Sequence, residues 1–165
     1  MKSLVQSPAV VFELKSNDLR ANAKIPNTFV YSGTGCAGEN KSPELHWSGA
    51  PEDAKSFAVT VYDPDSPTGS GFWHWIVFNI PASVSSLATG WKNDVGASEV
   101  QNDLGISAYS GPCPPPGKPH RYIFTVHALK TARLEVPPEA TNAIVRFMIE
   151  GATIQKAKLQ ATYER

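Results

Sequence analysis

Short segments of alternating apolar and polar residues, separated by turns, constrain the fold of this chain more than any other feature. They are rich in β-branched and aromatic residues, and the clearest are TFVYSG (28–33), ELHWSG (44–49), SFAVTVYD (56–63), WHWIVFNIP (73–81) and RYIFTVHAL (121–129). Alternation with a period of two is typical of β-strands, and the Gly, Pro, Asn and Asp residues between the segments are typical of turns. The pattern predicts an antiparallel, mainly β fold.

Helical sequence is scarce. The stretch 138–151 predicts the clearest helix, because prolines stand at its start and Gly151 is a natural stop. The apolar face predicted for this helix contains Ala140, Ala143, Ile144, Phe147 and Met148. The following stretch predicts a last strand over 157–165, with Ala157, Leu159, Ala161 and Tyr163 on one side.

Length and charge limit the class of protein. At 165 residues the chain predicts a single domain, 1–165, able to bury roughly 70% of the surface of its unfolded state. Fifteen basic residues balance fifteen acidic ones, without a run of like charge. The basic surface expected of a nucleic-acid-binding protein is therefore missing, and we expect no nucleic-acid partner.

Apolar runs and cysteines bear on the compartment. The N-terminal apolar run, Ala9 to Phe12, is shorter than the roughly 7 to 15 residues of a signal-peptide core, and no other run approaches the roughly 20 of a membrane span. We expect a cytoplasmic protein without a membrane span. Disulfides are rare in the cytoplasm, so Cys36 and Cys113 are expected to be two reduced thiols.

Three stretches carry residues able to do chemistry. DPDSP (63–67) ends one predicted strand, and His74 stands near the start of the next. The proline-rich stretch GPCPPPGKPHRY (111–122) then leads into a third strand, and its prolines hold a fixed backbone shape that positions His120 and Tyr122. If the strands 56–62, 73–80 and 121–129 are neighbours, these residues line one rim.

The chemistry of this rim favours an anion but leaves alternatives open. Histidines, a tyrosine hydroxyl and the backbone N–H groups around Gly111 can donate to phosphate oxygens, whereas Asp63 and Asp65 would repel an anion. Either Asp63 pairs with a histidine and favours its charged form, or it receives the ammonium group of a zwitterion such as phosphoethanolamine. Arg121 points away and is expected to hold Asp65 bidentately, which is a structural role.

Other interpretations of the same residues compete with ligand binding. Each aspartate alone is typical of turn chemistry, and a lone histidine in a strand is usually a hydrogen-bonded core residue. A hydrolase could use the histidines and carboxylates for acid–base chemistry, but no activated nucleophile accompanies them. A metal site of Asp63, His74 and His120 has no supporting sequence spacing, and no cofactor is expected.

The motifs resemble a known family. In their order along the chain, SPELHW (42–47), DPDSP (63–67), the loosely matching GFWHW (71–75) and GPCPPPGKPHRY (111–122) resemble the phosphatidylethanolamine-binding protein family. The chain is most similar to its bacterial branch of Raf-kinase-inhibitor-like proteins, from about residue 12 to the last strand. The resemblance implies a β-sandwich of two packed antiparallel sheets with one or two short helices.

The resemblance also implies a function. It implies a small pocket for phosphate-like anions and phospholipid head groups, regulation of a kinase or protease rather than turnover, and a homodimer. Carried over by motif position, the ligand-binding residues are Asp63, Asp65, His74, Gly111, Pro112, His120 and Tyr122. The sequence departs from the family at Cys113, inside the pocket loop, and at Phe72, where animal members carry tryptophan. The extra C-terminal helix of animal members is not expected here.

Overall fold

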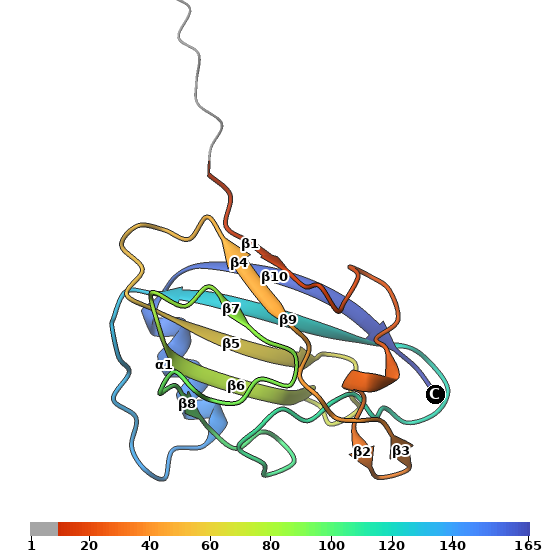
Figure 1. Ribbon diagram of the computed structural model, residues 1–165. Coiled ribbons are helices and arrows are strands. Elements are labelled where there is room, and N and C mark those ends of the chain that lie inside the picture. Colours follow the sequence, from red (N-terminus) through yellow and green to blue (C-terminus); the bar gives the residue numbers. More distant parts are fainter. Residues whose placement is uncertain (1–9) are drawn as a thin grey trace, which may run out of the picture.

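A five-stranded antiparallel sheet forms the centre of the fold, shown in Figure 1. The computed structural model describes residues 10–165. The strand order is β10-β9-β5-β6-β8. The bounds are β5 Ser56–Asp63, β6 Phe72–Pro81, β8 Ser98–Glu99, β9 His120–Leu129 and β10 Thr153–Tyr163. The central strands β5, β6 and β9 are buried along most of their length, so both faces of the sheet must be covered.

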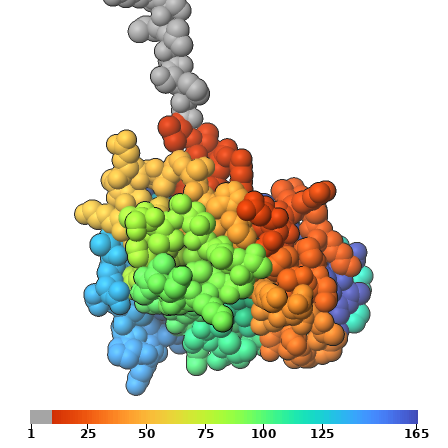
Figure 2. Space-filling view, in the orientation of Figure 1, coloured from red at the N-terminus to blue at the C-terminus, as the bar shows by residue number. Residues whose placement is uncertain are grey.

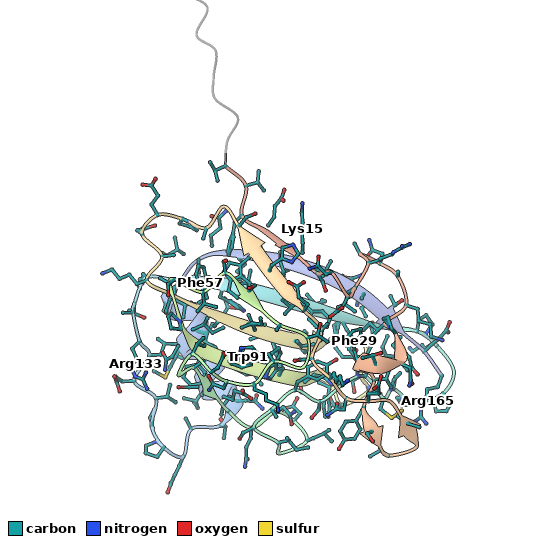
Figure 3. All side chains as sticks on the ribbon, in the orientation of Figure 1. Lys15, Phe29, Phe57, Trp91, Arg133 and Arg165 are labelled. Atoms are coloured by element: carbon teal, nitrogen blue, oxygen red, sulfur yellow. A yellow bond between two sulfur atoms is a disulfide. The ribbon has the colours of Figure 1, made fainter. Side chains whose placement is uncertain are left out.

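A small sheet covers one face of the central sheet (Figure 1). Its strands are β1 Glu13–Lys15, β4 Leu45–Ser48 and β7 Ser86–Leu87, in the order β1-β4-β7. The main apolar core fills the space between the two sheets, and Phe57 of β5, labelled in Figure 3, packs there against Trp47 of β4. These two packed antiparallel sheets confirm the predicted mainly β sandwich.

The helix α1, Asn142–Ala152, covers the other face of the central sheet (Figure 1). Thr141 caps it by accepting a hydrogen bond from the backbone N–H of Ile144. The predicted apolar face is only partly right: Ala140 and Met148 pack against the core on this side, but Ile144 and Phe147 are exposed, Phe147 by 78%. The buried residues of the helix are Val145, Ile149 and Ala152. The helix carries apolar side chains around most of its circumference, so periodicity alone could not identify the face that packs against the sheet.

The ends of the helix also differ from the prediction. The prolines at 137 and 138 lie in the turn before it, and Gly151 lies within its last turn instead of stopping it. The chain passes directly from Ala152 into β10, so this strand starts at Thr153 and not at 157. The predicted inward side of that strand is confirmed, because Ala157, Leu159, Ala161 and Tyr163 contact the main core.

The stretch 28–33 is mostly not the predicted strand. It contains a short 3-10 helix, Asn27–Phe29, followed by the strand β2, Ser32–Gly33, which pairs with β3, Cys36–Ala37. Pro26 has the extended backbone of a capping residue just before this turn. The apolar side chains of Phe29 and Val30 are buried nonetheless, which is why the stretch has the composition of a strand.

The prediction of two reduced thiols is wrong. A disulfide joins Cys36 to Cys113, with 6.0 Å between their Cα atoms. It ties the β2–β3 hairpin to the proline-rich loop, defined here as residues 111–119. The two cysteines are 77 residues apart in sequence, so only the folded chain brings them together.

None of the helices within residues 10–165 is long and apolar enough to cross a membrane. Residues 1–9, which include the start of the short apolar run read from the sequence, lie outside the described part of the chain.

Candidate functional site

A cavity of about 150 Å³ opens where β5 ends and β9 begins. The strand order places β5 between β6 and β9, which confirms that the three predicted strands are neighbours. The strands contribute Asp63, Phe72, His74 and Tyr122 to the cavity wall. The proline-rich loop contributes Gly111, Cys113, Pro114 and Pro115.

A β-bulge places His74 in this cavity. In the pairing of β5 with β6, Val61 faces Trp75 and Tyr62 faces Trp73, so that His74 is the extra residue. Trp75 packs in the core between the sheets, whereas Trp73 packs on the helix side. Simple alternation along the segment 73–81 predicts both tryptophans on one face, and the bulge makes that prediction wrong. The bulge turns His74 toward Tyr122, and their ring centres are 5.3 Å apart.

The hydrogen bonds of His74 determine which of its ring nitrogens carries the proton. Its Nδ1 lies 2.8 Å from the carbonyl oxygen of Ser110. A carbonyl can only accept, so Nδ1 carries the proton and donates. Burial lowers the pKa of His74, although Ser110 and the carboxylate of Asp63 act in the opposite direction. The ring is therefore neutral near pH 7, and its Nε2 is an acceptor.

Asp63 is held by two protein donors. The Nδ1 of His120 lies 2.7 Å from Oδ2, and the backbone N–H of Asp65 donates to Oδ1 at 2.8 Å. The side chains of Asp63 and His120 are each 3% exposed. Asp63 lines the cavity, whereas His120 lies behind it and is not part of the wall. The geometry thus shows the histidine pairing that was one of the two roles considered for Asp63.

Asp65 faces away from the cavity and pairs with Arg121. The guanidinium donates from Nε to Oδ2 at 3.0 Å and from Nη2 to Oδ1 at 2.9 Å, which is the expected bidentate contact. This hydrogen bonding lowers the pKa of Asp65 to about 2. Arg121 is half exposed, so the pair fixes the turn after β5 without burying a charge.

Tyr122 presents a polar atom without a partner. It is 1% exposed, and its hydroxyl makes no hydrogen bond of normal geometry within residues 10–165, although the carboxylate of Asp63 is near enough to act on it. Burial and the nearby carboxylate of Asp63 raise the pKa of Tyr122, so the hydroxyl keeps its proton. A buried hydroxyl without a partner is costly, on the order of 1–3 kcal/mol, and such groups commonly face a ligand or water.

The N–H of Gly111 itself is already engaged and is not free to act as the expected donor. The Gly111 N–H already donates to Oδ1 of Asn40 at 2.7 Å, and the Pro112 carbonyl accepts from the N–H of Tyr31 at 3.1 Å. A Cβ atom on Gly111 would lie 2.1 Å from the carbonyl oxygen of Phe29, so glycine is required here by close backbone packing. Pro112 is not part of the cavity wall.

Sequence reasoning missed part of the wall. Tyr31, Thr34, Ser66 and Leu104 line the cavity from segments without a predicted role. Ser66 lies inside the DPDSP motif and could have been included, whereas the other three stand in segments with no catalytic or binding pattern. Both Tyr31 and Thr34 lie in the segment 27–40, orange in Figure 2. The N–H of Tyr31 donates to the Pro112 carbonyl and the Thr34 hydroxyl to Sγ of Cys113, which brings both residues to the proline-rich loop.

Within residues 10–165, no group of three or more His, Cys, Asp or Glu side chains is arranged to hold a metal ion. Asp63 and His120 instead bond to each other, and His74 bonds to Ser110.

Comparison with known proteins gives the family. Residues 15–164 match the profile of the phosphatidylethanolamine-binding protein family. The chain belongs to this family. YbcL of Escherichia coli K12 is 46% identical over 163 residues, which cover 94% of this chain and 89% of YbcL. YbhB of the same organism is 43% identical over 156 residues, covering 92% and 99% of the two chains.

Solved structures of family members have the same fold. The crystal structure of Escherichia coli YbcL, described as a new member of the mammalian family, superposes with a TM-score of 0.89 at 46% identity, covering 93% of this chain and 98% of that one. A putative family homologue from Chlamydia trachomatis gives 0.81 at 32% identity, covering 94% and 99%. The carboxypeptidase Y inhibitor in complex with its proteinase gives 0.53 at 16% identity over 95% and 84%, which shows the fold alone.

Proposed function

We propose that this protein binds, without catalysis, a small phosphate-bearing or zwitterionic ligand in the cavity beside Tyr122. The observation that carries the proposal is the buried Tyr122 hydroxyl, which makes no hydrogen bond of normal geometry within the described residues and lies on the cavity wall beside Asp63 and His74. A ligand oxygen accepting from this hydroxyl would remove the cost of leaving it unpaired. Membership of the phosphatidylethanolamine-binding protein family supports a ligand-binding role.

A zwitterionic head group fits the polar groups of the wall. Its oxygens could accept from Tyr122, while its ammonium could donate to Asp63 or to Nε2 of His74. The volume of about 150 Å³ suits a head group and not a whole lipid. Leu104 and Phe72 lie on the same wall and offer apolar surface to the rest of an amphiphilic ligand.

The alternative of a hydrolase lacks an activated nucleophile, because no side-chain base is hydrogen-bonded to the wall hydroxyls of Ser66 and Thr34 among the described residues. Cys113 is bonded to Cys36 and cannot attack a substrate, and the raised pKa of Tyr122 keeps its hydroxyl protonated. Turnover of a generic phosphoester that is lost in His74→Gln would support the hydrolase over the binding protein.

A regulatory role toward another protein is part of the proposal. A kinase or a protease is the class of partner that the family suggests, and one relative in fold is named as a carboxypeptidase Y inhibitor. A homodimer is also expected, and sedimentation would test it.

The cytoplasmic location expected from the sequence is disfavoured by the Cys36–Cys113 disulfide, because such bonds persist mainly in oxidising compartments.

Calorimetric titration with phosphoethanolamine tests the ligand proposal. Tyr122→Phe should weaken binding on the order of 10- to 100-fold, the worth of a hydrogen bond to a charged group. Tyr163→Phe is the matched control, because it removes a tyrosine hydroxyl outside the cavity wall and should leave the affinity unchanged. Absence of binding, or equal affinity in Tyr122→Phe and the wild type, would refute the proposal.

A further inference from the structure

A second cavity lies on the helix side of the central sheet and has a volume of about 300 Å³. Its floor contains Thr60 of β5 and His127 of β9, both 4% exposed, and its walls come from α1 and the start of β6. Among the described residues, none lines both this helix-side cavity and the cavity beside Tyr122. Its volume lies at the lower end of the range of small-molecule sites, roughly 300–1,000 Å³. The helix-side cavity is therefore a candidate site in its own right.

Arg146 of α1 places a fixed positive charge on the wall of the helix-side cavity. Its guanidinium carbon lies 4.1 Å from the ring centre of Trp73, and Tyr62 stacks on the same indole with 4.1 Å between ring centres. Two groups this close to one ring must occupy its two faces. Nε and Nη2 of Arg146 also donate to Oδ1 of Asn142, at 3.2 and 3.1 Å. The guanidinium is thus held in place before any ligand arrives, which lowers the entropy cost of binding to it.

This charge has no counter-ion among residues 10–165. No carboxylate in that range forms an ion pair with Arg146, and its Nη1 makes no hydrogen bond there. Asp103 acts on Arg146 only from a distance. The two carboxylate oxygens of Asp103 accept instead from the Trp73 N–H at 2.8 Å and from Nδ2 of Asn142 at 2.9 Å. Nη1 of Arg146 is therefore free to donate to an anionic ligand.

The floor of the helix-side cavity is polar but offers no charge to an anion. The Thr153 hydroxyl donates to the Ile149 carbonyl at 2.7 Å, so its oxygen accepts from Nδ1 of His127, 3.5 Å away. With the proton on Nδ1, Nε2 is an acceptor, and the Thr60 hydroxyl donates to it at 3.1 Å. Burial lowers the pKa of His127 to about 4, so the ring is neutral at pH 7. An anion is therefore attracted to Arg146 and not to this floor.

Apolar side chains form much of the remaining wall. Ala143, Phe147 and Ile149 of α1 line the helix-side cavity together with Trp73. Phe147 is 78% exposed, so most of its ring faces solvent. An apolar ligand would cover part of this ring, and removing such surface from water favours binding.

We infer that the helix-side cavity binds a small apolar monocarboxylate, with the carboxylate on Arg146 and the apolar body against Phe147. A planar carboxylate matches the planar guanidinium. A phosphate dianion fits less well, because Asp103 acts on the same guanidinium and would repel a second negative charge. Glu150 on the wall is paired with Lys156 at 2.6 Å, so it does not cancel the attraction of Arg146. This site does not depend on the ligand proposed for the cavity beside Tyr122.

Three probes test the inference on the wild-type protein at pH 7, with the amide signals of isotope-labelled protein followed by NMR. 3-Phenylpropionate is ionised at this pH. It should bind about fivefold or more tightly than 3-phenylpropanol, which has the same ring without the charge. It should also bind about tenfold or more tightly than propionate, which has the charge without the ring. The shift changes should centre on α1 and Trp73 and not on the proline-rich loop.

Two variants with matched controls test the wall directly. Arg146→Gln should weaken 3-phenylpropionate binding about fivefold or more and leave 3-phenylpropanol unchanged, because it removes only the charge. Arg133→Gln is its control, since it removes a half-exposed guanidinium that lines a different cavity. Phe147→Ala should weaken both aromatic probes about threefold or more. Ile144→Ala is its control, because Ile144 is an exposed residue of the same helix that does not line the helix-side cavity.

Each outcome supports or overturns the inference. Equal affinity for the acid and the alcohol overturns it, as does the absence of binding at 10 mM probe or a shift pattern confined to residues 111–119. None of these results bears on phosphoethanolamine binding beside Tyr122, so the two proposals fail separately. If Arg146→Gln does not fold, the wild-type probe series still decides the role of the charge, and Phe147→Ala decides the place of the apolar body.

Discussion

Loss of the disulfide between Cys36 and Cys113 should destabilise the protein strongly and weaken its cavity. The bond closes a loop of 77 residues and holds the β2–β3 hairpin against the proline-rich loop. Cys113 itself lines the cavity. The perturbation is the double substitution Cys36→Ser with Cys113→Ser, which removes the bond and leaves two small polar side chains.

The size of the effect follows from the length of the closed loop. In the chain-entropy account, releasing a loop of 77 residues stabilises the unfolded state by about 4.5 kcal/mol. For a protein of this length that corresponds to a fall in Tm of about 10–15 °C. The folded state should survive, because the loop is also held by the Gly111–Asn40 hydrogen bond and by Arg165, which donates to the Pro114 carbonyl at 2.6 Å. Figure 3 shows Arg165 at this end of the molecule.

Urea unfolding of the wild type and of the double variant, each with and without a dithiol reductant, measures the effect. The reductant should lower the free energy of unfolding of the wild type toward that of the variant and should not affect the variant. Phosphoethanolamine affinity should fall in the variant, because one wall of the cavity is no longer tied down. An unfolding free energy within 1 kcal/mol of the wild type would refute the reasoning, as would free thiols in protein purified without reductant.

Two further perturbations test other parts of the structure. Burial lowers the pKa of His127 in the folded protein to about 4, whereas the same side chain in the unfolded chain has a pKa near 6.5. Between these two pH values the unfolded chain binds a proton that the folded protein does not. The free energy of unfolding should therefore fall by up to about 3 kcal/mol as the pH drops from 6.5 to 4. Urea unfolding at several pH values would show this slope, and His127→Gln should flatten it; an unchanged slope in the variant would assign the effect to other groups. Replacing Pro115 and Pro116 by glycine should weaken phosphoethanolamine binding while costing less stability than the disulfide, because both prolines are exposed and add little to the core. Calorimetry that finds equal affinity would show that loop rigidity does not serve binding.

The central strands could be predicted closely because their signal is local. Alternating β-branched and aromatic residues mark β5, β6 and β9, and each observed strand lies within one residue of its predicted ends. The motifs at the ends of these strands predicted that Asp63, His74 and Tyr122 would meet, and the strand order β9-β5-β6 brings them together. Their role in binding stays a prediction until a ligand is measured.

Local signals failed where the choice depended on a distant neighbour. The face of α1 that packs was decided by the sheet beneath it, since the helix carries apolar residues on several sides. The β-bulge at His74 is invisible in a pattern of period two, yet it reverses the relation between Trp73 and Trp75. The stretch 28–33 has the composition of a strand because its side chains are buried, although its backbone turns through a 3-10 helix.

The sequence by itself determined the class of fold, the positions of the main strands along the chain and the stiffness of the proline-rich loop. These properties follow from periodicity, backbone restriction and turn chemistry within a few residues. Only the tertiary structure decided the polarity of the cavity. It joined Cys36 to Cys113, gave the Gly111 N–H to Asn40 and tied His74 to the carbonyl of Ser110. Each of these contacts spans at least 36 residues of chain, and a hydrogen-bonding group acquires its role only when folding assigns it a partner.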